Sequence, residues 1–156
     1  MSGRSAQHAT FVVERTYDAP PAEVFAAWAE PAAKTRWFGS ADEPGSEYEL
    51  DFRVGGREFS RGTAPNGQTY TFEALYQDIV PDERTVYTYE MHLDEPRISV
   101  SLSTVELRPD GPRTRLTYTE QGVFLDGLDS PAQREQGTGG LLDALGAELR
   151  RERTSA

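Results

Sequence analysis

Residues 68–94 read QTYTFEALYQDIVPDERTVYTYEMHLD, two stretches rich in aromatic and β-branched residues with a turn signal between them. Aromatic side chains recur at alternate positions in both stretches, which is the side-chain period of a β-strand. Pro81 and Asp82 mark a tight connection, and a connection this short joins antiparallel neighbours. The stretch therefore predicts a hairpin with strands at about 68–80 and 84–94.

The same alternation extends to both sides of this hairpin. From Tyr48 to Val54, apolar side chains alternate with charged ones, so that one face of the strand is apolar and the other faces water. Gly55 and Gly56 then suit a hairpin turn. We therefore expect the remaining strands at 10–17, 47–54, 57–63, 97–108 and 113–121, all in one antiparallel sheet.

Near the N-terminus the period changes to that of a helix. Pro21 suits a helix start, and apolar residues at helical spacing predict a short helix over 21–29. Pro31 breaks this helix before a second helical turn that ends near 37–39. The predicted order up to this point is one strand and two short helices.

The last segment is helical as well. Ser130 followed by Pro131 resembles a capped helix start, and a stripe of leucines predicts a helix over 130–152. Three glycines between 137 and 140 weaken its first half by up to about 1 kcal/mol each relative to alanine. Either the helix begins late, or close packing there requires small residues. The complete order predicts an α+β fold, a curved antiparallel sheet wrapped around a long C-terminal helix.

Composition excludes several classes of function. The formal net charge of −10 repels phosphate backbones and anionic lipid headgroups, so we expect neither nucleic acid nor membrane insertion. The chain has no cysteine, which rules out disulfides, thiolate zinc sites and cysteine nucleophiles. No apolar run is long enough for a signal peptide or a membrane span, and we expect a cytoplasmic protein.

The length of 156 residues suits one domain. We expect a single domain over 1–156 with an ordered core at about 10–152. Residues 1–8 and 153–156 carry little that can be buried, and we expect them to be frayed. The oligomeric state stays open, with a homodimer as one alternative.

Four short motifs and their order resemble the START/Bet v 1-like (SRPBCC) superfamily. They are APPAEVF at 19–25, WFG at 37–39, RVGGR at 53–57 and LTYTEQG at 116–122. The chain is most similar to the branch of bacterial homologues of the activator of the Hsp90 ATPase, which is described loosely as polyketide cyclase-like. The resemblance covers about residues 10–150.

This resemblance implies a helix-grip fold with a cavity between the concave face of the sheet and the C-terminal helix. It does not imply one activity, because members of the superfamily variously bind lipids, cyclise polyketides, engage chaperones or resist toxic metabolites. Fold alone is therefore a poor guide to function.

The aromatic residues of the predicted strands are the most informative feature for function. One helix cannot easily cover a sheet of this width, so we expect an aromatic cavity, although an ordinary packed core is the alternative. The predicted ligand-binding residues are Trp37, Phe38, Tyr48, Phe52, Phe59, Phe72, Tyr76, Tyr89, Met91, Tyr118, Glu120, Leu142 and Leu145.

Glu120 is the one weak candidate for a catalytic residue. It has the same strand parity as Tyr118, so a carboxylate here would face aromatic side chains and could act as an acid or a base. The alternative is a structural ion pair, with Arg134 as one candidate partner. Arg57 and Arg61 share parity with Phe59, and they either meet an acidic ligand or pair with surface acids.

No cofactor and no metal are predicted. His8 lies in a predicted tail. His92 has the opposite strand parity from Tyr89 and Met91, so its side chain is expected to face solvent. Neither histidine therefore suits a metal site or a catalytic triad.

Three functions stay open. The first is a module that binds a small hydrophobic or aromatic molecule, in stress response or secondary metabolism. The second is a cyclase or lyase in which Glu120 and a tyrosine act as the acid–base pair. The third is a chaperone-interaction module without a ligand, which the sequence itself does not support.

Overall fold

The computed structural model describes residues 3–38 and 45–155, and within them it has one sheet and three helices. The helices are α1 (Pro21–Ala29), α2 (Pro31–Trp37) and α3 (Pro131–Ser155). The strands are β1 (Ala6–Tyr17), β2 (Glu47–Leu50), β3 (Arg57–Thr63), β4 (Thr69–Val80), β5 (Arg84–Leu93), β6 (Arg97–Asp110) and β7 (Arg113–Leu125). This is the α+β order that the sequence predicts.

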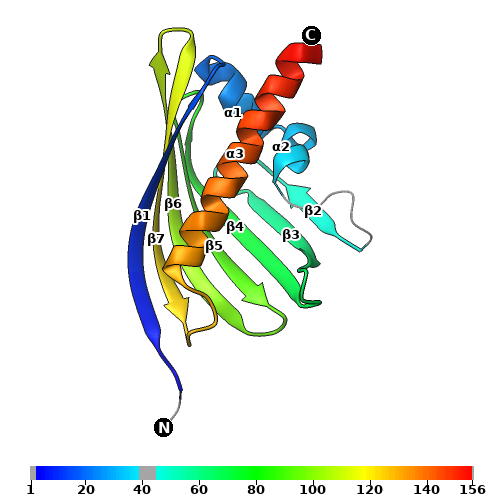
Figure 1. Ribbon diagram of the computed structural model, residues 1–156, viewed down its shortest axis with the longest axis vertical. Helices are drawn as coiled ribbons and strands as arrows, with labels where there is room; N and C mark the ends of the chain where they lie inside the picture. Colours follow the sequence, from blue (N-terminus) through cyan, green and yellow to red (C-terminus); the bar gives the residue numbers. More distant parts are fainter. Residues whose placement is uncertain (1–2, 39–44, 156) are drawn as a thin grey trace.

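All neighbouring strands are antiparallel, in the order β1-β7-β6-β5-β4-β3-β2. Each strand from β2 to β7 pairs with the next one along the chain, because the connections between them are short. β1 closes the other edge by pairing with β7. Figure 1 shows α3 lying across the concave face of the curved sheet, with α1 and α2 beside its C-terminal half. The predicted helix-grip fold is confirmed.

The hairpin predicted from 68–94 is β4 and β5. Tyr76 pairs with Tyr87 in its register, and the register shifts by one residue between Tyr76 and Asp78. Asp82, in the turn, has φ +66°, a left-handed conformation that aspartate tolerates better than most residues. This bulge and turn add twist to the centre of the sheet and so help to make it concave.

α3 begins at Pro131, where the sequence places it. The Ser130 Oγ accepts a hydrogen bond from the Gln133 backbone N–H at 3.1 Å, which caps the first turn. The helix therefore does not begin late. Nor does close packing require the glycines at 137 and 140, since a Cβ at either would meet nothing within 4 Å. Among the three, Gly139 has a close neighbour, the Arg15 guanidinium at 3.1 Å.

The hydrophobic core lies between the C-terminal half of α3, the sheet and the two short helices. Leu142, Leu145 and Leu149 of the predicted stripe are all buried there. The Tyr17 hydroxyl donates to the Leu142 carbonyl at 2.7 Å, which ties α3 to β1. On the other side of α3, the Arg36 guanidinium of α2 donates a hydrogen bond to the Glu148 carboxylate of α3 at 2.5 Å.

The expected hairpin between the strands that begin at 47 and 57 is present, but the end of the first strand at 54 and the tight turn at Gly55-Gly56 are wrong. β2 ends at Leu50, and residues 51–56 form a loop that folds back onto β4. The Gly55 N–H donates to the Tyr76 carbonyl at 2.8 Å, and the Gly56 carbonyl accepts from the Tyr76 N–H at 3.0 Å. Alternation in the sequence did not detect this loop, because its pairing is with a strand about 20 residues away.

The sheet and the last helix extend into the terminal segments that we expect to be frayed. Ala6 to His8 belong to β1 and pair with β7, and α3 continues to Ser155. Residues 1–2, 39–44 and 156 lie outside the described residues, and with them part of the predicted turn at 37–39. Over the described ranges, no helix combines the length and apolarity needed to cross a bilayer.

We predict that Gly56→Ala lowers the free energy of unfolding by at least about 2 kcal/mol. A Cβ at this position would lie 2.0 Å from the Asp51 backbone oxygen, so the loop over 51–56 must shift. Urea unfolding followed by circular dichroism measures the change. Gly140→Ala is the matched control and should stabilise the protein by up to about 1 kcal/mol. Equal stability of Gly56→Ala and the wild type would contradict this account of the loop.

Candidate functional site

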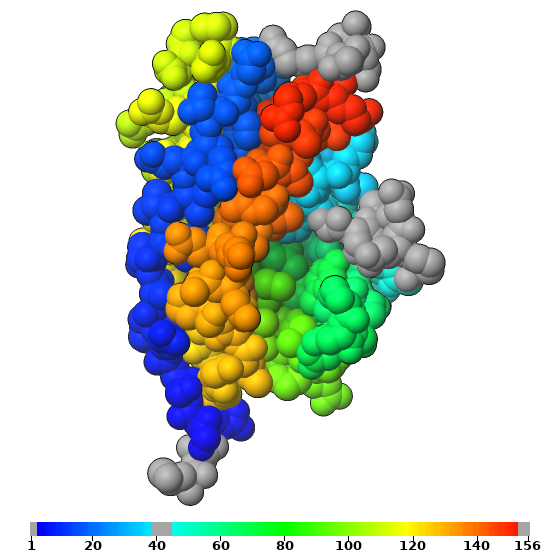
Figure 2. Space-filling model, in the orientation of Figure 1, coloured from blue at the N-terminus to red at the C-terminus, as the bar shows by residue number. Residues whose placement is uncertain are grey.

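A cavity of about 340 Å³ lies between the first half of α3 and the concave face of the sheet. In Figure 2 the surface is hollowed beside the start of α3 (orange), where side chains of the green strands lie deeper. Its apolar and aromatic lining is Trp28, Trp37, Phe38, Tyr70, Phe72, Tyr87, Tyr89, Met91, Tyr118, Leu141 and Leu142. Its other lining residues are Ser60, Asp129, Gln133, Arg134, Gly137 and Thr138. The cavity thus has an aromatic wall and one polar end, at the start of α3.

Many of the predicted ligand-binding residues meet around this cavity. Those in its lining are Trp37, Phe38, Phe72, Tyr89, Met91, Tyr118 and Leu142. They come from α2, α3 and three separate strands, and alternation on the strands points their side chains to the same face.

Other predicted residues lie outside the lining. Tyr48 and Tyr76 are turned toward Glu58, and Phe52 packs edge-on against Tyr76 with ring centroids 4.8 Å apart. Leu145 is buried in the core.

The placement of Phe59 in the cavity is wrong. Its neighbours Glu58 and Ser60 are both buried, and Ser60 lines the cavity, so alternation along β3 puts Phe59 on the opposite face. Arg61 accompanies it there, with its guanidinium 5.9 Å from the Phe59 ring centre. β3 is short and has charged residues on both faces, so the sequence pattern does not decide which face is inward.

Three aromatic lining residues are absent from the predicted set: Trp28, Tyr70 and Tyr87. A signal for two of them was present, because Tyr70 shares parity with Phe72 and Tyr87 with Tyr89. Trp28 lies on the apolar face of α1, and that face packs against the sheet in a way that helical periodicity alone does not reveal.

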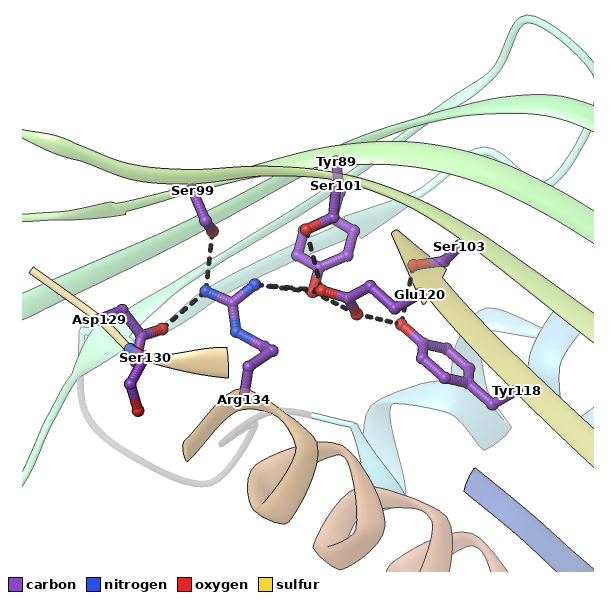
Figure 3. Close-up of polar contacts among 9 residues, drawn as sticks. All are labelled: Tyr89, Ser99, Ser101, Ser103, Tyr118, Glu120, Asp129, Ser130 and Arg134. Carbon is purple, nitrogen blue, oxygen red and sulfur yellow. Dashed lines mark hydrogen bonds and ion pairs between the residues drawn. The ribbon is translucent and has the colours of Figure 1, made fainter. Parts of the chain in front are cut away.

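Glu120 is fully buried beneath the aromatic wall and is surrounded by donors (Figure 3). Its carboxylate accepts hydrogen bonds from the hydroxyls of Tyr89 and Ser101 at 2.8 Å and of Tyr118 at 2.7 Å. Ser103 Oγ lies 2.8 Å from the Tyr118 hydroxyl and donates to it, since the Tyr118 proton is committed to Glu120. The predicted parity of Glu120 is correct, but its side chain is fully buried and is not among the described residues that line the cavity.

Arg134 extends from α3 into the same network (Figure 3). Its guanidinium donates to the Tyr89 hydroxyl at 2.9 Å, to Ser99 Oγ at 2.7 Å and to the Asp129 carboxylate at 2.8 Å. It lies 3.4 Å from Glu120, so the ion pair considered from the sequence is present. Burial opposes the charge of Arg134, but Tyr89, Glu120 and Asp129 outweigh it and hold its pKa above the ordinary value.

A second buried acid, Glu58, organises the other end of the concave face. It accepts hydrogen bonds from the hydroxyls of Tyr48 and Tyr76, each at 2.6 Å, and pairs with Lys34 at 3.1 Å. The Lys34 ammonium also lies 4.6 Å from the ring centre of Phe38. Burial lowers the pKa of Lys34, although Glu58 acts in the opposite direction. Sequence analysis missed this pair, because its members are 24 residues apart and each resembles a surface charge.

Within 3–38 and 45–155, no three histidine or acidic side chains cluster in a way that could hold a metal ion. His92 is half-buried beside Glu90, and His8 lies in β1. The cavity can therefore be described by its apolar wall, its tyrosine hydroxyls and the polar groups at the start of α3.

Comparison with known proteins gives a consistent relationship. A family model described as Activator of Hsp90 ATPase homolog 1-like protein matches residues 18–150. A solved structure from Rhizobium leguminosarum is 46% identical, with a TM-score of 0.90, over 95% of this chain and 98% of that one. A protein from Rhizobium loti is 51% identical, with a TM-score of 0.86, over 92% of this chain and 99% of that one. No curated protein sequence matches this chain.

We predict that Glu120→Gln lowers the free energy of unfolding by about 3 kcal/mol. The amide keeps the shape of the side chain but removes the charge that faces Arg134 and turns an N–H₂ group toward hydroxyl donors. Glu73→Gln, at an exposed position of β4, is the matched control and should change stability by less than about 0.5 kcal/mol. Urea unfolding measures both. A Glu120→Gln variant as stable as the control would show that the network adds nothing to the fold.

We predict that the native protein resists tyrosine ionisation. Burial is the main cause that raises the pKa of Tyr17, Tyr48, Tyr76, Tyr87, Tyr89 and Tyr118 above the ordinary value. Because the folded-state pKa is raised, this stabilisation is complete below the unfolded-state pKa near 10 and is lost as the pH rises above it.

Tyrosinate absorbance at 295 nm measures the effect. At pH 11 the folded protein should show much less absorbance than the same protein unfolded in urea. The urea concentration at which half of the protein is unfolded should decrease when the pH is raised from 9 to 11. Titration curves that coincide in the two states would contradict the buried tyrosine clusters.

Proposed function

The chain belongs to the family of Activator of Hsp90 ATPase homolog 1-like proteins, and within that fold we propose that it binds a small hydrophobic or aromatic molecule between the sheet and α3. The single observation that carries this proposal is the cavity of about 340 Å³ with its aromatic wall. Natural ligand sites have this character: a concave, mainly apolar space with a few polar groups that orient the ligand.

The tyrosines of the wall suit such a ligand because their hydroxyls are already committed. Tyr89 and Tyr118 both donate to Glu120, so their rings face the cavity as apolar surfaces. Burying about 250 Å² of ligand surface against them contributes roughly 6 kcal/mol before the costs of association are subtracted. Because 6 kcal/mol corresponds to a dissociation constant of roughly tens of micromolar even before those costs, we expect weak binding.

The cyclase or lyase alternative has less support. Glu120 is fully buried, has four donors around it and is not among the described residues that line the cavity, so its carboxylate is poorly placed to reach a substrate. The hydroxyl of Tyr89 donates to Glu120 and accepts from Arg134, which leaves it poorly placed to transfer a proton.

The chaperone-interaction alternative requires an exposed apolar surface and a filled cavity. Val12, Val100 and Leu102 are exposed on the sheet, and Val100 and Leu102 lie together on β6 beside Val123, so the exposed apolar area is small. The open cavity counts against this alternative.

We predict that Gly137→Leu weakens ligand binding at least about tenfold. Gly137 lines the cavity, and a side chain there would extend into open space at its mouth. The probe is 6-propionyl-2-(dimethylamino)naphthalene, a neutral dye whose fluorescence increases and shifts to the blue in apolar sites. Fluorescence titration measures its dissociation constant.

Gly140→Leu is the matched control. Gly140 lies in the same helix, also has open space around it, and is not among the described residues that line the cavity. Both variants should raise thermal stability slightly, because leucine favours a helix more than glycine does. The control should bind the dye as the wild type does. If the wild type binds no dye, or Gly137→Leu binds it unchanged, the proposed site is wrong.

A further inference from the structure

Two buried hydroxyl groups in the wall of the cavity have no hydrogen-bond partner. Of the buried serine and threonine side chains in the described residues, four are paired with another group: Ser99, Ser101, Ser103 and Thr114. Within the described ranges, the hydroxyls of the other three have no partner: Ser60, Thr85 and Thr138. Ser60 and Thr138 line the cavity. Buried hydroxyls normally have a partner, so two of the three exceptions lie at the candidate site.

Both oxygen atoms are accessible from the cavity. Ser60 is 4% exposed and Thr138 is 7% exposed. Among the described residues, Trp28 Nε1 is the only unpaired side-chain nitrogen or oxygen that is sealed completely from solvent. The unpaired oxygens of Ser60 and Thr138 therefore touch accessible space. Because both side chains are otherwise buried, that space is the cavity that they line.

Ser60 marks the β3 end of a row of lining residues. It lies opposite Phe72 in the register of β3 and β4, and Phe72 lies opposite Met91 of β5. All three residues line the cavity. Because neighbouring strands are about 4.8 Å apart, the row has a hydroxyl at one end and about 10 Å of apolar surface beside it.

Thr138 lies on the helical wall, near the other end of this row. Ser99 of β6 follows Met91 in the register, and its hydroxyl accepts a hydrogen bond from Arg134 at 2.7 Å. Thr138 follows Arg134 by four residues in α3, so the two side chains lie on the same face of the helix, about 6 Å apart along its axis. A ligand that lies along the row can therefore contact Ser60 at one end and Thr138 near the other.

The charged groups around the cavity are already paired. Lys34, whose ammonium lies over the aromatic wall, pairs with Glu58 at 3.1 Å. Arg134 is shared between the carboxylates of Glu120 and Asp129. Three acids and two bases leave this region with a charge of −1, and the net charge of −10 on the chain acts in the same direction. An anion is therefore disfavoured, and uncharged groups such as the two hydroxyls remain to orient a ligand.

We propose that Ser60 and Thr138 determine specificity, each by forming one hydrogen bond to an uncharged oxygen at one end of an elongated aromatic ligand. A hydroxyl both donates and accepts, so a phenol or a ketone suits either position. The inference rests on the proposed function, since it requires a ligand in the cavity. It adds the polarity of the ligand and the spacing of its polar groups.

Four naphthalene probes test the proposal with the full chain. 2,6-Dihydroxynaphthalene has an oxygen at each end, 2-naphthol has one oxygen, naphthalene has none, and 6-hydroxy-2-naphthoate is an anion. Displacement of 6-propionyl-2-(dimethylamino)naphthalene measures the affinity of each probe. The wild type should bind the diol about threefold to tenfold more tightly than 2-naphthol, the range expected for one net hydrogen bond. It should bind 2-naphthol more tightly than naphthalene, and the diol more tightly than the anion.

Two variants assign this preference to the two hydroxyls. Ser60→Ala and Thr138→Val should each weaken binding of the diol about threefold to tenfold and leave the affinity for naphthalene unchanged. Thr138→Ser keeps the hydroxyl and should keep the preference for the diol. Thr85→Val is the matched control, because it removes a buried, unpaired hydroxyl from a residue that is not among the described residues lining the cavity. It should bind every probe as the wild type does.

Stability separates this role from a structural one. Because neither hydroxyl bonds to another described residue, Ser60→Ala and Thr138→Val should keep the urea midpoint of the wild type. The comparison of probes on the wild type needs no variant. If the wild type binds the three neutral probes equally, or if both variants keep the preference for the diol, the role of the hydroxyls is wrong while the binding function stands. If neither the dye nor any probe binds, the proposed function itself fails.

Discussion

The contact between Glu120 of β7 and Arg134 of α3 is the constraint on which the candidate site depends. A buried carboxylate is costly unless charge and hydrogen bonds compensate it, and here a guanidinium, two tyrosines and a serine do so. Because these partners come from the sheet and from the helix, the network sets how closely the first turns of α3 approach the concave face. The second half of the helix is held by Leu142, Leu145 and Leu149 instead, where the packing is dense. The cavity occupies the space between these two attachments.

The concave face repeats one arrangement at two places. Glu58 and Glu120 each accept from two tyrosine hydroxyls, and each has one cation beside it, Lys34 for the first and Arg134 for the second. The consequence is chemical as well as structural. Tyrosines whose hydroxyls point at a buried acid present their rings as apolar surface, so a wall rich in hydroxyl groups behaves largely as an aromatic one. This explains how a chain with a strongly acidic composition can form an apolar cavity.

The composition of α3 accounts for the position of the cavity along the helix. Its first half has Gly137, which lines the cavity without a side chain, whereas its second half has the leucines that fill the core. Glycine lowers helix stability, and the Ser130 cap and the Arg134 network offset part of that loss. Open space and aromatic surface therefore occur together beside the first half of the helix.

Local patterns in the sequence were sufficient for the order of the elements, for most of their bounds, for the capped start of α3 and for the inward parity of Tyr89, Tyr118 and Glu120. These features depend on periodicity and on turn residues within about ten positions of each other. The tertiary structure alone decided that Phe59 faces outward, that residues 51–56 form a loop against Tyr76, and that Lys34 meets Glu58. It also decided that, of two neighbouring indoles, Trp37 has an acceptor and Trp28 has none. The physical reason is that register and pairing between distant segments are set by packing across the sheet, which a single strand or helix does not encode.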